Sequence, residues 1–269
     1  QISLLINTIF ASFLSTGSVS WLYYADRLME FPAGVLGVAL STVLLPNLSK
    51  SFSEKKYLNY SSLINWGLKL AILLGAPAAI ALGLLAIPII TTLFFYGAFN
   101  QNDVLMTQYA VIAYSIGLIG LILVKVLAPA FYAKQNIKTP VKIAIFTLFC
   151  TQFMNLLFIG YFKHAGLALS VGLGACINAA LLFYFLLKDS SFKLESDWLS
   201  FIFRVIAALI GMSFFLFFMR GSIEDWVSFT LLVKLLKLLL LIASGSTVYF
   251  IILLLLGINL KEFFNKKIV

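Results

Sequence analysis

Three ionisable side chains lie close together in a segment that otherwise has the composition of a membrane helix. Asp26, Arg27 and Glu30 stand among tryptophan, tyrosine, leucine and methionine residues between Ser20 and Pro32. A charge at bilayer depth costs about 2.5–3.5 kcal/mol or more, so ionisable residues there usually face a water-filled path or a binding site. Arginine suits phosphate because its planar guanidinium donates two parallel hydrogen bonds and stays charged at any pH. The cluster therefore predicts a binding site for an anion.

The spacing predicts which neighbours share a helix face with the arginine. Four residues recur at the interval of one helical face, namely Ser20, Tyr23, Tyr24 and Arg27. If the helix begins about two residues before Ser20, Arg27 lies about 13 Å along it, near the bilayer midplane. Glu30 is the better local partner for Arg27, whereas Asp26 points to a different face. The alternative is that Asp26 or Glu30 neutralises Arg27, which then serves packing alone.

A predicted hinge follows the charges. Pro32 has no backbone N–H, and its ring clashes with the carbonyl of Leu28, so a kink is expected beside the cluster. Gly34 comes two residues later. Bent helices near the midplane recur at the substrate sites of transporters.

Other polar residues within apolar segments are less specific candidates. Lys125, just before Pro129, either extends its flexible stem toward the interface or lines a cavity. Extension toward the interface is expected for cations nearer the segment ends, namely Lys69, Arg204, Lys234 and Lys237. Hydrogen bonds between helices, or alternatively a cation site, are expected of Asn7, Gln152, Asn155 and Asn178.

The composition predicts an all-α polytopic membrane protein. Of 269 residues, 62% are hydrophobic and 11% charged, and mean hydropathy is +1.06; soluble domains have about 25% charged residues. Eight apolar segments follow one another, at about 1–14, 18–46, 61–95, 104–132, 139–160, 165–187, 198–219 and 230–257. The first rises only about 21 Å, less than a hydrocarbon core of about 30 Å. Because the chain also lacks an initiator Met, we expect it to begin inside a truncated helix of a longer protein.

Basic residues alternate between the connections. The second, fourth, sixth and C-terminal connections carry eleven, namely Lys50, Lys55, Lys56, Lys134, Lys138, Lys142, Lys188, Lys193, Lys261, Lys266 and Lys267. The other connections carry two, Lys163 and Arg220. By the positive-inside rule the lysine-rich side, with the C-terminus, is predicted to be cytoplasmic.

Several function classes are disfavoured. Motifs of hydrolases, phosphate-binding loops and redox Cys-x-x-Cys pairs are absent from the sequence, so we expect no enzyme, no cofactor and no metal site. The only histidine, His164, is expected to be exposed or interfacial in a short turn. The net charge of +9 comes mostly from connections between segments, so no nucleic-acid partner is expected.

A stripe of small residues predicts close packing of two helices in segment 165–187. Its members recur at helical spacing, and they are Ala168, Gly172, Cys176 and Ala179. Small side chains let two helix backbones approach closely in a membrane. Such packing is expected in any bundle and does not itself indicate a function.

Four stretches closely resemble the MurJ (MviN) family of bacterial lipid II flippases. The resemblance is strongest to the proteobacterial members of that family. The four stretches are residues 17–32 (Gly-Ser-Val-Ser-Trp-Leu-Tyr-Tyr-Ala-Asp-Arg-Leu-Met-Glu-Phe-Pro), 34–46, 132–142 and 163–167. The resemblance runs the whole length. It implies the multidrug/oligosaccharidyl-lipid/polysaccharide exporter superfamily, with fourteen helices in two six-helix lobes and a C-terminal pair. This chain would hold the second lobe (1–190) and the pair (191–269), with the first lobe absent.

The resemblance also implies a substrate. Arg27 matches one of the cavity arginines that bind the lipid II diphosphate, and Ser20 matches a cavity-lining position. The last two helices resemble those of a groove proposed for the undecaprenyl tail. Membrane lipids and the missing N-terminal lobe would be the other partners, in the bacterial inner membrane.

Three hypotheses follow. The first is part of a lipid II flippase that works by alternating access, with Arg27 on the diphosphate and the Pro32 region as hinge. The second is a related exporter of another polyprenyl-linked glycan, or a cation-coupled drug exporter, which would more naturally use a lone carboxylate. The third is a structural membrane subunit whose charges are satisfied internally, without a water-filled cavity.

Overall fold

The computed structural model describes residues 2–259 and 263, and these residues form helices and no strands. The helices are α1 (Ile2–Ser12), α2 (Ser18–Ser53), α3 (Tyr57–Leu84), α4 (Ala86–Leu93), α5 (Gln101–Tyr132), α6 (Lys138–Leu187), α7 (Trp198–Met219), α8 (Ile223–Ser228) and α9 (Leu231–Leu255). Six of them are long and apolar enough to cross a membrane: α2, α3, α5, α6, α7 and α9. The predicted all-α membrane fold is confirmed.

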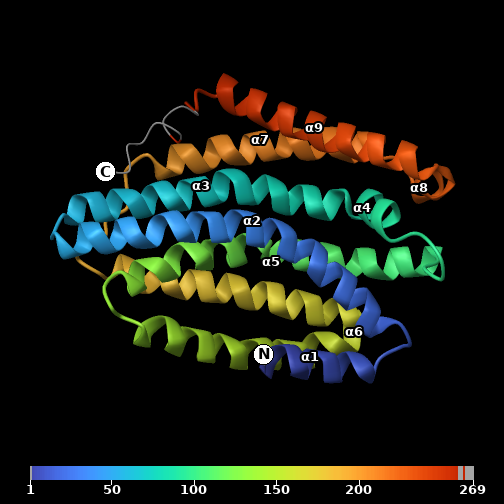
Figure 1. The fold of residues 1–269 in the computed structure, drawn as a ribbon, viewed down its shortest axis with the longest axis horizontal. Helices are drawn as coiled ribbons and strands as arrows, with labels where there is room; N and C mark the ends of the chain where they lie inside the picture. The colour runs from blue at the N-terminus through green and yellow to red at the C-terminus, as the bar shows by residue number, and fades with distance from the viewer. Residues whose placement is uncertain (1, 260–262, 264–269) are drawn as a thin grey trace.

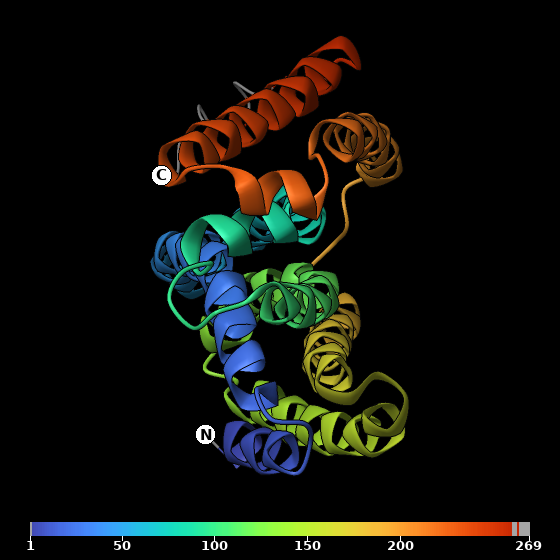
Figure 2. The same cartoon turned by 90° about the vertical axis from the view of Figure 1, so that its right-hand side faces the viewer.

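The eight apolar segments all reappear, with two differences in how they are divided. α6 has 50 residues but reverses direction at Lys163, whose φ is +50° and ψ −129°. Its two arms therefore run antiparallel, as two of the predicted segments (Figures 1 and 2). The predicted segment 61–95 instead divides at Leu85 into α3 and the short α4.

The connections gather at two ends of the bundle (Figure 1). One end, here called the lysine-rich end, holds the connections 54–56, 133–137 and 188–197. The opposite, lysine-poor end holds the connections 13–17 and 94–100, the reversal in α6, and α8. The alternation predicted from the sequence is confirmed for these connections. Lys261, Lys266 and Lys267 lie outside the described residues, as does Gln1.

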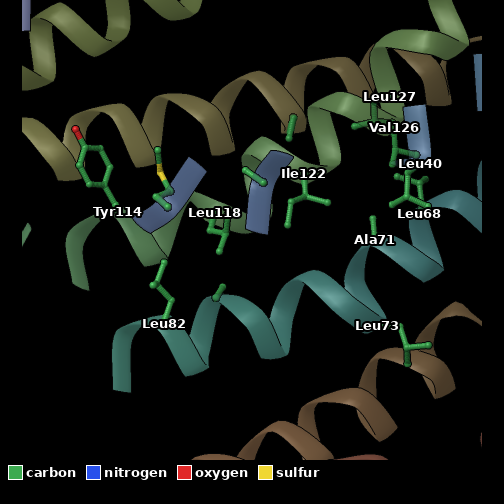
Figure 3. Close-up of a cluster of buried hydrophobic side chains, with 14 of the residues drawn as sticks. Leu40, Leu68, Ala71, Leu73, Leu82, Tyr114, Leu118, Ile122, Val126 and Leu127 are labelled. Atoms are coloured by element: carbon green, nitrogen blue, oxygen red, sulfur yellow. The ribbon is translucent and has the colours of Figure 1, made fainter. Parts of the chain in front are cut away.

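The core forms around α5, which packs against α2, α3 and α6. Tyr114, Leu118, Ile122 and Val126 of α5 recur every four residues and are buried (Figure 3). Ile122 and Val126 pack against glycines of α3, whereas Tyr114 lies toward α2 and α6. Such a stripe covers one face of a helix, because side chains four residues apart lie one above the other.

The opposite face of α5 meets α6 through glycine. A Cβ atom placed on Gly117 would lie 2.0 Å from the Cα of Gly172, and one on Gly120 would lie 2.7 Å from the backbone nitrogen of Cys176. The two backbones therefore touch directly. The close approach predicted from the small-residue stripe is confirmed, and α5 is the partner helix.

The α7–α9 pair lies to one side of the bundle against α3 and α4 (Figure 2). The connection before α7 is held by α3. Asn65 donates to the carbonyl of Lys193 at 2.9 Å and accepts from the indole of Trp198 at 2.7 Å. The Lys69 ammonium lies 2.6 Å from Glu195 and 2.8 Å from Asp197. Lys69 thus reaches toward the lysine-rich end as expected, where its largely buried side chain pairs with two exposed carboxylates.

We predict that Gly117→Ala destabilises the bundle, because the added methyl group would overlap the backbone of α6. Overpacking of this kind costs about 1–3 kcal/mol. The measurement is the thermal unfolding midpoint in detergent. Gly160→Ala is the matched control, since nothing lies within 4 Å of its Cβ position and alanine favours a helix over glycine. Equal midpoints for the two variants would contradict the tight contact.

Candidate functional site

The candidate site lies on the first half of α2. Thirty-six residues rise about 54 Å as a helix, far more than the roughly 30 Å hydrocarbon core. The helix continues through two interior prolines, Pro32 and Pro46, and it bends midway along its length (Figure 1). The bend turns the first half, which carries the charges, toward α1 and α6. The predicted kink beside Pro32 agrees with this path.

Arg27 and Glu30 form the ion pair that their spacing predicts. Nη1 of Arg27 lies 2.5 Å from Oε2 of Glu30, and each side chain is 53% exposed. The guanidinium carbon also lies 5.0 Å from the centre of the Tyr23 ring. An exposed ion pair is worth only about 0–1 kcal/mol. The ion pair therefore offsets little of the free-energy cost of two charges within an apolar helix. A role in packing alone does not explain why these charges are present.

A cavity of about 410 Å³ opens beside the arginine, between α1, α2, α5 and α6. Arg27, Asp26 and Tyr23 line it from α2, Tyr114 from α5, and Leu167 from α6. Its volume lies in the range of about 300–1,000 Å³ that is typical of small-molecule sites. Asp26 was expected on a different face from Arg27, yet both side chains line this cavity.

Other predicted site residues lie outside the cavity. Tyr24 turns away from Arg27, and its ring centre lies 4.6 Å from that of Phe94 and 5.5 Å from that of Phe99. Ser20 is exposed near the start of α2 but does not line the cavity. Glu30 reaches the site only through Arg27. The structure thus groups Asp26 with Arg27 more closely than it does Ser20 or Tyr24.

Lys125 lies in a different part of the bundle. Its stem packs across Gly37 of α2, so that a Cβ placed there would be 2.4 Å from the Cδ of Lys125. Gly37 is ten residues beyond Arg27, about 15 Å along a helix. Lys125 does not line the Arg27 cavity. The predicted hinge residue Gly34 lies next to open space, with nothing within 4 Å of its Cβ position.

A polar network between α1 and α6 borders the cavity. Asn155 donates to the side chain of Asn7 at 2.8 Å and to that of Gln152 at 3.0 Å, and Gln152 approaches Ser3 at 3.4 Å. Ser3 and Asn7 also line the cavity. Hydrogen bonding between helices, predicted for these amides, is confirmed. Within the described residues no group of three His, Cys, Asp or Glu side chains is placed to hold a metal ion.

His164 corrects the sequence prediction. It was expected to be exposed or interfacial, but it is 3% exposed. Its Nε2 lies 2.8 Å from the carbonyl of Met106, and its ring centre lies 5.0 Å from that of Trp21. Trp21 in turn donates to Asp103 at 2.8 Å. The reversal at Lys163 turns the histidine inward, and no local sequence signal marks that backbone geometry.

The family model for "Lipid II flippase MurJ" matches residues 1–237. A probable lipid II flippase MurJ of Buchnera aphidicola subsp. Schizaphis graminum is 43% identical over 266 residues, 99% of this chain and 52% of the relative. The lipid II flippase MurJ of Burkholderia cenocepacia is 51% identical over 213 residues, 79% of this chain and 41% of the relative.

The solved structures agree. A lipid II flippase MurJ in an inward closed conformation superposes with a TM-score of 0.71 at 25% identity, over 94% of this chain and 52% of that one. The chain spans about half the length of the relatives that it matches. Because the family model matches most of the chain and the helical arrangement is shared, this chain belongs to the lipid II flippase MurJ family.

Proposed function

We propose that the chain forms the C-terminal part of a lipid II flippase, which moves a polyprenyl-diphosphate-linked peptidoglycan precursor across the inner membrane. The observation that carries the proposal is Arg27, a half-exposed arginine that lines a cavity of about 410 Å³ within an apolar helix. A guanidinium that lines a cavity is suited to bind a diphosphate, because it matches phosphate oxygens in geometry and charge.

The residues near Arg27 have further roles in this proposal. Glu30 holds the guanidinium at 2.5 Å in the absence of substrate, so an arriving diphosphate would compete with this carboxylate. Asp26 in the cavity wall would repel an anion bound too deeply. Ser20 and Tyr24 would border the headgroup path, and Lys125 would contribute a positive charge further along the central cavity.

The transport step is proposed to be alternating access about the bend in α2. Pro32 leaves the carbonyl of Leu28 without its helical N–H partner, so bending there breaks no further hydrogen bond. Residues 1–190 would move as the second lobe against a complementary first lobe, which is the other proposed partner. Residues 191–269 would form the groove for the lipid tail. The lysine-rich end, with the C-terminus, would face the cytoplasm.

Arg27→Ala is expected to abolish growth in a complementation test. In this test an intact flippase that contains the variant chain replaces the flippase of cells depleted of that protein. Losing a charged hydrogen bond should weaken diphosphate binding about tenfold or more. Arg27→Lys should restore activity only in part, since an ammonium lacks the bidentate fork. Arg204→Ala is the control, because Arg204 contacts the carbonyl of Gly257 instead. Full complementation by Arg27→Ala would rule out the role.

Pro32→Ala is expected to straighten α2 and slow transport, because residue 32 then regains an N–H for the Leu28 carbonyl. Spin labels at Ser20 and Ser49 should report a longer distance by pulsed electron resonance. Pro46→Ala is the matched control, since Pro46 is the second proline within the same helix. Unchanged transport together with an unchanged label distance would eliminate the hinge.

A cysteine at Ser20 is expected to react with a membrane-impermeant maleimide, whereas one at the fully buried Ala25 should not. The experiment also separates the flippase from a structural subunit, which would offer no water-filled path to α2. Protection of Ser20→Cys to the level of Ala25→Cys would favour the subunit. Added lipid II, but not a polyprenyl diphosphate bearing another glycan, should slow the labelling.

A further inference from the structure

A second pocket lies on the opposite side of the molecule from the Arg27 cavity. It has a volume of about 440 Å³ and is formed by α7, α8 and α9 at the lysine-poor end. Figure 2 shows these three helices on the far side of the bundle from α1. Two cations, Arg220 and Lys237, line it together with Asp225 and Trp226. The resemblance places this region in a groove for the lipid tail, but neither it nor the Arg27 site gives a role to these four polar residues.

Neither cation in this pocket forms an ion pair with a carboxylate of the described residues. The guanidinium of Arg220 lies 4.7 Å from the centre of the Phe217 ring, and its Nη1 lies 3.5 Å from the carbonyl of Leu84. The ammonium of Lys237 lies 3.7 Å from the centre of the Phe229 ring. No ion pair within the described part of the chain includes either residue. Both charges are therefore available to an anion.

The one carboxylate in the pocket is already engaged. Asp225 accepts from the backbone N–H of Ser222 at 3.1 Å and from its hydroxyl at 2.9 Å, as the capping box of α8. These hydrogen bonds from Ser222 lower the pKa of Asp225 below its ordinary value, with a smaller contribution from Lys237. Asp225 thus stays ionised but is oriented by the helix cap, and the pocket keeps an excess of positive charge.

A third cation adds to the positive potential nearby. Lys234 lies one turn before Lys237 on α9 and is 5% exposed. Its ammonium lies 4.8 Å from the centre of the Phe95 ring, and no carboxylate among the described residues forms an ion pair with it. A buried cation without a counter-charge attracts anions to the adjacent surface, because solvent screens it less.

The walls of the pocket are continuous with the lipid-facing surface. Met219 and Leu240 line the pocket and are also strongly exposed. The neighbouring outward faces of α7 and α9 are apolar and exposed as well, as at Phe218 and Leu239. A lipid from the adjacent leaflet can therefore place its headgroup in the pocket and its acyl chains along these helices.

We propose that this pocket binds the phosphate of an anionic phospholipid, phosphatidylglycerol, from the leaflet at the lysine-poor end. Arg220 provides the planar fork for two phosphate oxygens, and Lys237 provides a flexible point charge. The indole of Trp226 donates to the Arg220 carbonyl at 2.5 Å and closes the back of the pocket. The pocket volume lies within the usual range for small-molecule sites. The proposal does not depend on the transport activity.

The test is native mass spectrometry of the purified protein with added phosphatidylglycerol or phosphatidylethanolamine. Each cation should contribute about fivefold to phosphatidylglycerol binding, so Arg220→Gln with Lys237→Gln should weaken it about twenty-five-fold. Phosphatidylethanolamine binding should change little. Lys188→Gln is the matched control, since Lys188 also stacks on an aromatic ring, at 4.4 Å from Tyr184, but lies at the other end of the bundle.

Three results would overturn the proposal. They are undiminished phosphatidylglycerol binding in the double variant, an equal loss in Lys188→Gln, or displacement of the lipid by free glycerol phosphate at similar concentration. The last would assign the pocket to a soluble anion. If Arg220→Gln lowers the unfolding midpoint because the contact with Leu84 is lost, phosphatidylglycerol binding by the single variant Lys237→Gln is the deciding measurement. Lys237→Arg, which keeps the charge, should then restore binding.

Discussion

The contact of two glycine backbones in the middle of the bundle determines how the other helices are arranged. Because Gly117 and Gly172 carry no side chains, α5 and the second arm of α6 touch directly. The opposite face of α5 is then free to receive α2 and α3 through its buried stripe. The contact also sets one dimension of the candidate site. Tyr114 of α5 and Val171 of α6 stand beside these glycines, and both line the Arg27 cavity.

The first half of α2 departs from what stability alone favours. The interior proline lowers the helix propensity of this apolar segment, and the two charges add a desolvation cost. Arg27 and Glu30 recover little of this cost through their mutual contact, because both remain half exposed. Such local conflicts with the global fold are typical of functional positions. The bend in α2 places the charged first half of the helix beside the cavity wall formed by α1 and α6.

The α7–α9 pair is joined to the bundle by polar contacts at one end and by packing along α3 and α4. Asn65 and Lys69 hold the connection before α7 through its backbone and two carboxylates. Lys69 and the two cations of the α7–α9 pocket have different kinds of partner. At the lysine-rich end Lys69 is matched by carboxylates. At the lysine-poor end Arg220 and Lys237 stack on aromatic rings, and neither forms an ion pair within the described part of the chain. This difference separates a structural anchor from a surface that can accept an anionic ligand.

The sequence by itself determined the features that depend on the periodicity of one helix. It predicted eight apolar segments, the alternation of basic connections, the Arg27–Glu30 pair and the small face around Gly172, since each follows from neighbours a few residues apart. Only the tertiary structure decided which helix covers which side chain. It placed Asp26 beside Arg27 in one cavity, turned Tyr24 against Phe94, and buried His164 behind a reversal. The physical reason is that a residue's surroundings are made by helices distant in sequence, whose contacts no local pattern records.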